Sequence, residues 1–208
     1  MSRRASLPLW IAALALLLAA CSGSPPNGEV DQRQAGVLWQ HHQAQLQAIR
    51  DFVLSGRIAE LGLTGNRADL KWTQQAAHFE VRVSGPLGVG ALLLSGVPDS
   101  VTIRTKDGVL QTRDPSDFMQ QQLGWSLPVA RLRYWVLGLP APGSAPSLLL
   151  DAQGRAATLQ QDGWNLQYLE YQTVGALALP RKLELADGTH RFRLVIDQWS
   201  DLADGDGA

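Results

Sequence analysis

The chain has 208 residues, a formal net charge of −1 and a single cysteine. The near-neutral charge does not fit a nucleic-acid-binding protein, whose surfaces are strongly basic, and one cysteine excludes an internal disulfide or a site of paired thiols. Charged residues make up only 18% of the sequence and there are seven tryptophans, so the chain has much apolar surface to bury, since average domains are roughly one quarter charged.

The N-terminus carries a secretory signal sequence that ends at the cysteine. Two arginines precede an apolar run over residues 7–20, and small residues lead into Cys21. The run is shorter than the roughly 20 apolar residues that span a bilayer. We therefore expect residues 1–20 to be removed and Cys21 to carry the lipid anchor. Ser22 follows it, a pattern that resembles lipoproteins sent to the outer membrane of Gram-negative cells.

A tether and a helix are expected next. Residues 22–29 are mostly turn formers with almost nothing apolar, which is typical of a short flexible tether behind Cys21. The following segment, 30–52, is predicted to be one amphipathic helix because its apolar residues recur at helical spacing. These apolar residues are Val37, Leu38, Leu46, Ile49 and Phe52.

Beyond residue 52 the apolar period changes to two, as in half-buried antiparallel strands. Phe79, Val81 and Val83 show it most clearly. Strands are predicted at 52–61, 68–73, 79–84, 89–95, 101–104, 109–113, 147–150, 156–160, 164–171, 182–186 and 190–199. Asp-Gly pairs at 107–108, 162–163 and 187–188 are typical hairpin turns. We expect one domain over 30–200, built on a meandering sheet curled into a sandwich or barrel, and a disordered tail at 201–208.

One segment interrupts the strands. Residues 115–138 are predicted to form two short helices, the first around Met119 and the second over 129–137. Pro128 suits the start of the second helix, where a missing N–H costs nothing, and Gly138 suits its end. We expect the second helix to be a lid, with its apolar side on the sheet and its two arginines facing outward.

No pattern of catalytic or metal-binding residues stands out. The four histidines (41, 42, 78 and 190) lack ligand spacing, the glycine cluster 85–90 lacks the ending of a phosphate loop, and no GxSxG motif occurs. We therefore expect no cofactor, no metal and no enzymatic activity. A lipid-anchored periplasmic hydrolase stays open as an alternative, which a pocket with paired acids and a histidine would support.

Aromatic side chains are expected to crowd the concave side of the sheet. By themselves they favour an ordinary core over a ligand pocket. They are Trp39, Phe52, Trp72, Phe79, Trp125, Trp135, Trp164, Tyr168 and Trp199.

Several motifs together resemble the LolB family of outer-membrane lipoprotein receptors. The most specific is LRYWVLGLP at 132–140; the lipidation motif, the helix before the strands, GPLG at 85–88 and the segment 180–194 occur in the matching order. The resemblance covers the mature chain. It implies an open, half-closed antiparallel β-barrel with helices over a concave apolar face.

The resemblance also implies a function. The cavity of the family receives the acyl chains of lipoproteins from the periplasmic carrier LolA, and the receptor releases them into outer-membrane phospholipid. A protruding leucine inserts into the membrane, and the matching residue is Leu87, flanked by Pro86 and Gly88. We expect a monomer that faces the periplasm and binds no nucleic acid. The residues expected in the lipid cavity and lid are Phe52, Trp72, Phe79, Val81, Val101, Ile103, Leu132, Trp135, Val136, Trp164, Leu166 and Tyr168.

A structural adaptor without an internal cavity is the second alternative. It would present a sheet edge or surface patch to an envelope partner. Binding of a fluorescent apolar probe distinguishes the two, because a receptor binds the probe and an adaptor does not.

Overall fold

The computed structural model describes residues 30–62, 67–85, 91–123 and 125–204, and the structural statements below refer to these residues. They contain three helices and eleven strands, in a compact unit that begins at Asp31. The helices are α1 (Gln32–Ala48), α2 (Ser116–Leu123) and α3 (Val129–Trp135). The strands are β1 (Ile49–Glu60), β2 (Arg67–Gln75), β3 (His78–Ser84), β4 (Leu92–Val97), β5 (Ser100–Thr105), β6 (Gly108–Thr112), β7 (Ser147–Leu150), β8 (Ala156–Gln161), β9 (Trp164–Val174), β10 (Leu177–Ala186) and β11 (Arg191–Asp204).

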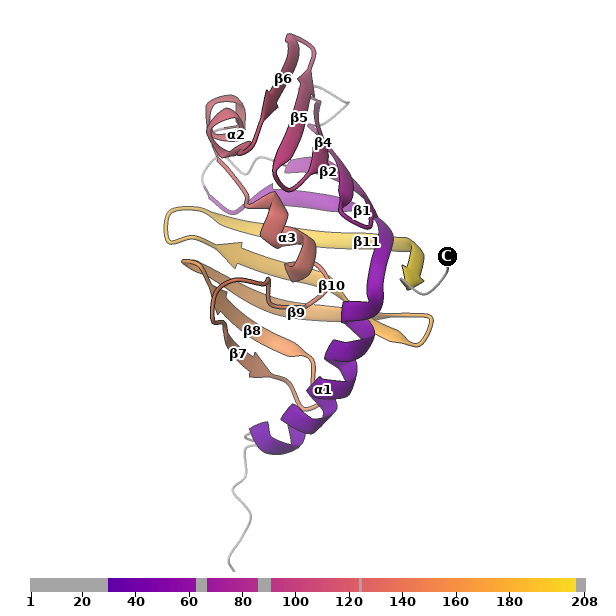
Figure 1. Cartoon of the computed structure of the whole chain (residues 1–208). Helices are drawn as coiled ribbons and strands as arrows, with labels where there is room; N and C mark the ends of the chain where they lie inside the picture. The colour runs from indigo at the N-terminus through magenta and orange to yellow at the C-terminus, as the bar shows by residue number, and fades with distance from the viewer. Residues whose placement is uncertain (1–29, 63–66, 86–90, 124, 205–208) are drawn as a thin grey trace, which may run out of the picture. The chain divides into compact units, whose positions relative to one another are not determined.

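All described strands belong to one antiparallel sheet in the order β6-β5-β4-β3-β2-β1-β11-β10-β9-β8-β7 (Figure 1). Neighbours in sequence pair through turns, and the pairing of β1 with β11 joins the two halves. The end strands β6 and β7 are not paired with each other, so the sheet is open. The predicted open antiparallel fold is confirmed. The turn at Asp162 and Gly163 has φ of 51° and 81°, the left-handed conformation that hairpins with the Asp-Gly sequence adopt.

Strand alternation buries one face of the sheet. In β3, Phe79, Val81 and Val83 are buried, while Glu80 and Arg82 between them are exposed. The buried face packs aromatic rings against one another: the Phe52 and Trp72 ring centroids lie 6.1 Å apart, and those of Phe52 and Trp199 5.5 Å apart. This face forms the core with the helices that pack on it.

Helix α1 docks on the β7 end of the sheet. Asp31 caps it by accepting hydrogen bonds from the backbone N–H groups of the first turn. The Gln32 side chain pairs with the backbone of Leu150, donating to its carbonyl (3.0 Å) and accepting from its amide (3.2 Å). Gly154 lies so close that an added Cβ would contact the Leu38 side chain and the Trp39 backbone. The turn before β8 is therefore built to accept the helix.

The predicted extent and stripe of α1 were partly wrong. The helix ends at Ala48, because Ile49 and Phe52 already belong to β1 and pair with β11 and β2. Val37 and Leu38 are 70% and 45% exposed, whereas the buried positions are Ala35, Trp39 and Leu46. Apolar residues at 49 and 52 fit both the helical and the strand period. Their pairing with neighbouring strands decides in favour of the strand.

His42 on α1 predicts a pH effect on stability. Its Nε2 is buried and has no hydrogen-bond partner among the described residues, and burial, followed by the positive charge of Arg155, lowers its pKa below the usual 6.5. The folded protein then binds fewer protons than the unfolded chain, so the free energy of unfolding falls as the pH drops below 6.5. Urea unfolding at pH 7 and at lower pH checks this. His42→Gln removes that part of the acid sensitivity, while the same change at exposed His41 leaves it.

Several other strand bounds differ from prediction, most of all at β10 and β11. β11 continues to Asp204, past the expected domain limit at residue 200 and into the expected tail, because Ala203 and Asp204 pair with the start of β1. β10 begins at Leu177 rather than 182, since it pairs with β9 from the turn onward. The two short helices α2 and α3 are confirmed. Among the described residues, no helix is long and apolar enough to cross a membrane.

Candidate functional site

The space between the sheet and α2 and α3 is apolar and nearly full. Its remaining void measures about 20 Å³ and has an entirely apolar lining, which is room for about one water molecule. The expected hollow for acyl chains is thus closed in this conformation. The lining residues are Ile58, Leu70, Trp72, Val81, Val83, Leu94, Met119, Trp125, Leu127, Val129, Leu132, Leu185 and Leu194.

The predicted cavity residues divide into three groups. Trp72, Val81 and Leu132 line the void, and Phe79 and Val101 line a cleft described below. The others line neither; all but half-buried Trp164 are buried in the surrounding core. They are Phe52, Ile103, Trp135, Val136, Trp164, Leu166 and Tyr168.

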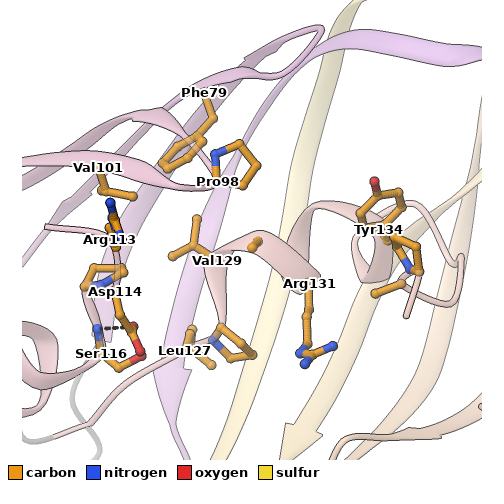
Figure 2. A pocket seen from close by; sticks show the side chains of 15 residues that line it. Phe79, Pro98, Val101, Arg113, Asp114, Ser116, Leu127, Val129, Arg131 and Tyr134 are labelled. Atoms are coloured by element: carbon orange, nitrogen blue, oxygen red, sulfur yellow. Dashed lines mark hydrogen bonds between the residues drawn. The ribbon is translucent and has the colours of Figure 1, made fainter. Parts of the chain in front are cut away.

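A surface cleft of about 520 Å³ lies beside the void (Figure 2). Phe79, Val101 and the start of α3 give it apolar walls, and Arg113 and Arg131 are among its charged lining residues. Leu127 and Val129 line both the cleft and the void. Their side chains therefore stand between the open cleft and the apolar interior.

The polar edge of the cleft is held by local hydrogen bonds. The backbone N–H of Ser116 donates to Asp114 Oδ1 (2.9 Å) (Figure 2). The hydrogen bonds from Ser116 hold the pKa of the Asp114 carboxyl below its usual value, so Asp114 is ionised at neutral pH. The cleft thus combines an apolar floor with a charged edge.

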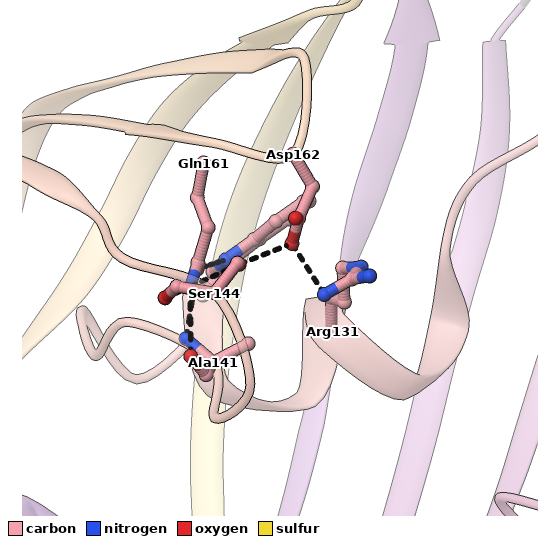
Figure 3. Close-up of polar contacts among 6 residues, drawn as sticks. Arg131, Ala141, Ser144, Gln161 and Asp162 are labelled. Carbon is pink, nitrogen blue, oxygen red and sulfur yellow. Dashed lines mark hydrogen bonds and ion pairs between the residues drawn. The ribbon is translucent and has the colours of Figure 1, made fainter.

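Gln161, at the end of β8, ties α3 and the segment after it to the sheet (Figure 3). Its Oε1 accepts from Trp135 Nε1 (3.0 Å) and from the amide of Ala141 (2.9 Å). Its Nε2 donates to the carbonyls of Ala141 (2.7 Å) and Ser144 (3.1 Å). The residue is only 3% exposed, so these bonds satisfy a polar group that would be costly to bury alone.

An ion pair reinforces the same connection nearer the surface. Arg131 on α3 pairs with Asp162 in the β8–β9 turn, and Ser144 Oγ donates to the same carboxylate at 2.8 Å (Figure 3). Both charged side chains are partly exposed, at 38% and 23%. We call the set Arg131, Ser144, Gln161 and Asp162 the α3 clamp. The prediction that Arg131 faces outward is thus only partly right.

Tyr168 also holds the C-terminal end of α3. Its hydroxyl donates to the carbonyl of Trp135 at 3.0 Å. Burial raises the pKa of Tyr168 well above the usual 10, so the hydroxyl stays protonated and remains a donor. The Trp135 and Trp164 rings pack with centroids 6.0 Å apart beside this bond. α3 is therefore held by apolar packing and a few directed hydrogen bonds.

The clamp and Leu127 were missed at the sequence level. A partial signal existed for Gln161, which lies two residues after Leu159 and so falls on the inner face of β8. A polar residue at such a position needs a buried partner. Nothing local identifies the partner of Arg131.

Cys21, Pro86, Leu87 and Gly88 lie outside the described residues. In the part of the chain that the structure describes, no group of three or more His, Cys, Asp or Glu side chains could hold a metal ion.

Comparison with known protein families gives one clear match. A family model described as outer membrane lipoprotein LolB matches residues 50–199. Three similar relatives carry the name outer-membrane lipoprotein LolB. The one from Nitrosococcus oceani is 41% identical over 191 residues, covering 88% of this chain and 92% of the relative. The one from Stutzerimonas stutzeri is 36% identical, covering 89% and 91%, and the one from Chromohalobacter salexigens is 35% identical, covering 96% and 94%.

Two solved structures are similar to this chain at low sequence identity. A DUF1329 family protein from Desulfovibrio piger superimposes with a TM-score of 0.51 at 7% identity, covering 85% of this chain and 94% of that chain. A LolA superfamily protein from Nitrosomonas europaea gives a TM-score of 0.49 at 8% identity, with 83% and 94% covered. The first likeness supports the open antiparallel architecture.

Proposed function

Because this chain belongs to the LolB family of outer-membrane lipoproteins, we propose that it is a receptor that accepts lipoproteins from the carrier LolA and inserts them into the inner leaflet of the outer membrane. Cys21 would carry its lipid anchor, facing the periplasm. The observation that carries the proposal is a fully apolar, nearly closed interior next to an open surface cleft. The side chains of Leu127 and Val129, which line both spaces, stand between the two.

The physical chemistry of the cargo explains this arrangement. Each buried methylene group contributes about 0.8 kcal/mol, so a lipoprotein with several long acyl chains cannot cross water at a useful rate. A receptor must take the chains directly from the carrier and release them directly into the bilayer. No bond is made or broken, so an apolar chamber that opens and closes is sufficient.

Acyl chains would enter through the cleft. Leu127 and Val129 line both spaces, so displacing them connects the cleft to the interior. The void of about 20 Å³ holds no acyl chain, and expansion must come from an element that can move away. The two side chains would thus act as the gate of the chamber.

α3 is the proposed lid. Its inner side, Leu132 and Trp135, is buried on the sheet, and a bound acyl chain can replace those contacts with apolar contacts of its own. The polar bonds that resist opening are concentrated in the α3 clamp. The ion pair of the clamp is partly exposed, so water can take over its interactions when the lid opens.

Leu87 is the proposed membrane-insertion residue, and its replacement gives a direct test. Leu87→Glu is expected to leave transfer of a labelled lipoprotein from LolA to the soluble chain unchanged but to block delivery to liposomes, because a carboxylate is costly to insert among acyl chains. The measurement follows the label from carrier to receptor and then to vesicles.

Leu169→Glu is the matched control, since Leu169 is a 46% exposed leucine on β9. The control variant should deliver like the parent. Equal delivery by Leu87→Glu and the parent would remove Leu87 from the mechanism, and a parent that takes no label from LolA would refute the receptor function.

A further inference from the structure

The outer face of the N-terminal half of the sheet carries a row of unpaired cations. Lys71 on β2 lies directly opposite Arg82 on β3, and Leu93 on β4 lies opposite both Arg82 and Arg104 of β5. Residues directly opposite in antiparallel strands share a face. Lys71, Arg82 and Arg104, here called the basic row, are all exposed.

The row carries an electrostatic cost that the fold does not offset. Like charges directly opposite each other in a sheet are destabilising, and no member of the row forms an ion pair or hydrogen bond within the described part of the chain. Asp69 and Glu80 are acids on the same face, but neither makes an ion pair with the row among the described residues. A fold-stabilising role therefore does not explain the row.

The other half of the sheet is organised differently. Lys182 and Arg181 pair with Glu170, and Arg193 pairs with Glu184. The paired and the unpaired cations lie on the same sheet but on different strands. Arg181, Lys182 and Arg193 have carboxylate partners and exposed Arg191 of β11 has none among the described residues, whereas every cation of the basic row is left for a partner outside the chain.

We infer that the basic row is a contact surface for anionic phospholipid headgroups. Lys71 and Arg82 line a shallow outer hollow of about 330 Å³ together with Ser55 and Ser84, and the hollow also contains Asp69 and the Arg57–Asp197 ion pair. Within the described residues, the two unpaired cations outnumber the one unpaired carboxylate, and ammonium, guanidinium and hydroxyl groups suit a lipid phosphate. Leu93 lies half-buried between the cations, as an apolar residue does at a membrane interface.

The position of the row favours a membrane over a protein partner. Arg82 lies two residues before the end of β3, and Leu93 is the second residue of β4. The row therefore crosses these strands next to the segment that joins them, which contains Leu87. The inference rests on the proposed function, because it places headgroup contacts beside the proposed insertion residue, where anionic lipid would hold the receptor during release.

The test compares two triple variants of the soluble chain that begins at Ser22. This form retains the compact unit that begins at Asp31. Lys71→Gln/Arg82→Gln/Arg104→Gln removes the row. Arg181→Gln/Lys182→Gln/Arg193→Gln makes the same change in net charge on paired cations. Binding to vesicles of phosphatidylethanolamine and phosphatidylglycerol is measured by sedimentation, with phosphatidylcholine vesicles as the uncharged reference.

The row variant is expected to bind the anionic vesicles roughly one hundredfold more weakly at low salt, since each basic residue near an anionic surface contributes about 1 kcal/mol. The control variant should bind like the parent, and high salt should abolish the difference. The melting temperature of the row variant should equal or exceed that of the parent, because the opposition of Lys71 and Arg82 is gone.

Equal vesicle binding by the two variants would overturn the inference. Unchanged vesicle binding with slower transfer from LolA would also overturn it, and would assign the face to the carrier instead. Either result leaves the receptor function standing if the parent still takes labelled lipoprotein from LolA.

Discussion

Covalent attachment of α3 to the β8–β9 turn is expected to slow cargo uptake by about tenfold or more. Arg131 and Asp162 form an ion pair across this contact, so the Arg131→Lys variant places an amine beside a carboxylate, and a carbodiimide can join the two as an amide. The interior void of about 20 Å³ must expand to admit an acyl chain. With the lid fixed, transfer of labelled lipoprotein from LolA should slow by about tenfold or more, as expected when a lid motion gates entry.

The control for this experiment lies in the same clamp. Carbodiimide also couples Lys182 to Glu170, whose side chains lie 3.1 Å apart, but that link forms in every variant. Arg131→Lys/Asp162→Asn receives the same treatment and cannot form the clamp link, so it should take up cargo like the untreated parent. Peptide mass spectrometry verifies the link. Unchanged uptake by the linked protein would show that α3 is not the lid.

Strand periodicity made most of the fold predictable from the sequence. Alternation such as Phe79, Val81 and Val83 identified strands, and the Asp-Gly pair at 162–163 identified a hairpin. Ile49 and Phe52 misled because they fit a helical stripe as well as a strand. Only pairing with β2 and β11 resolves that choice, and β11 lies about 140 residues further along the chain.

The candidate site was harder to predict than the fold for a related reason. Apolar residues on the inner face were identifiable, but alternation cannot tell a residue that lines the void, such as Trp72, from one packed in solid core, such as Ile103. The openness of the sheet came from the family resemblance, because the same strands also fit a sandwich. The α3 clamp depends on where α3 packs against a hairpin some 30 residues further along the chain, and no local sequence pattern indicates that position.

Loss of Gln161 is expected to destabilise the fold and loosen the lid together. Gln161→Leu keeps a similar side-chain volume but leaves Trp135 Nε1 and the amide of Ala141 without their acceptor. Each buried group left unsatisfied costs about 1–3 kcal/mol, so the free energy of unfolding should fall by about 2–5 kcal/mol in urea titrations. Hydrogen exchange of the α3 amides should accelerate beyond what this global loss explains, because the lost bonds hold that helix.

Gln74 offers a matched comparison in the same sheet. It is 1% exposed, accepts from Trp72 Nε1 at 3.1 Å and donates to the carbonyls of Ala76 and His78. Gln74→Leu should therefore lower the free energy of unfolding by a similar amount, but the hydrogen bonds that it removes lie at the β2–β3 turn and not at α3. If exchange in α3 and uptake from LolA changed equally in both variants, Gln161 would be an ordinary buried amide. If hydrogen exchange in α3 accelerated only in Gln161→Leu, the hydrogen bonds of this side chain would instead be identified as those that keep the empty chamber closed.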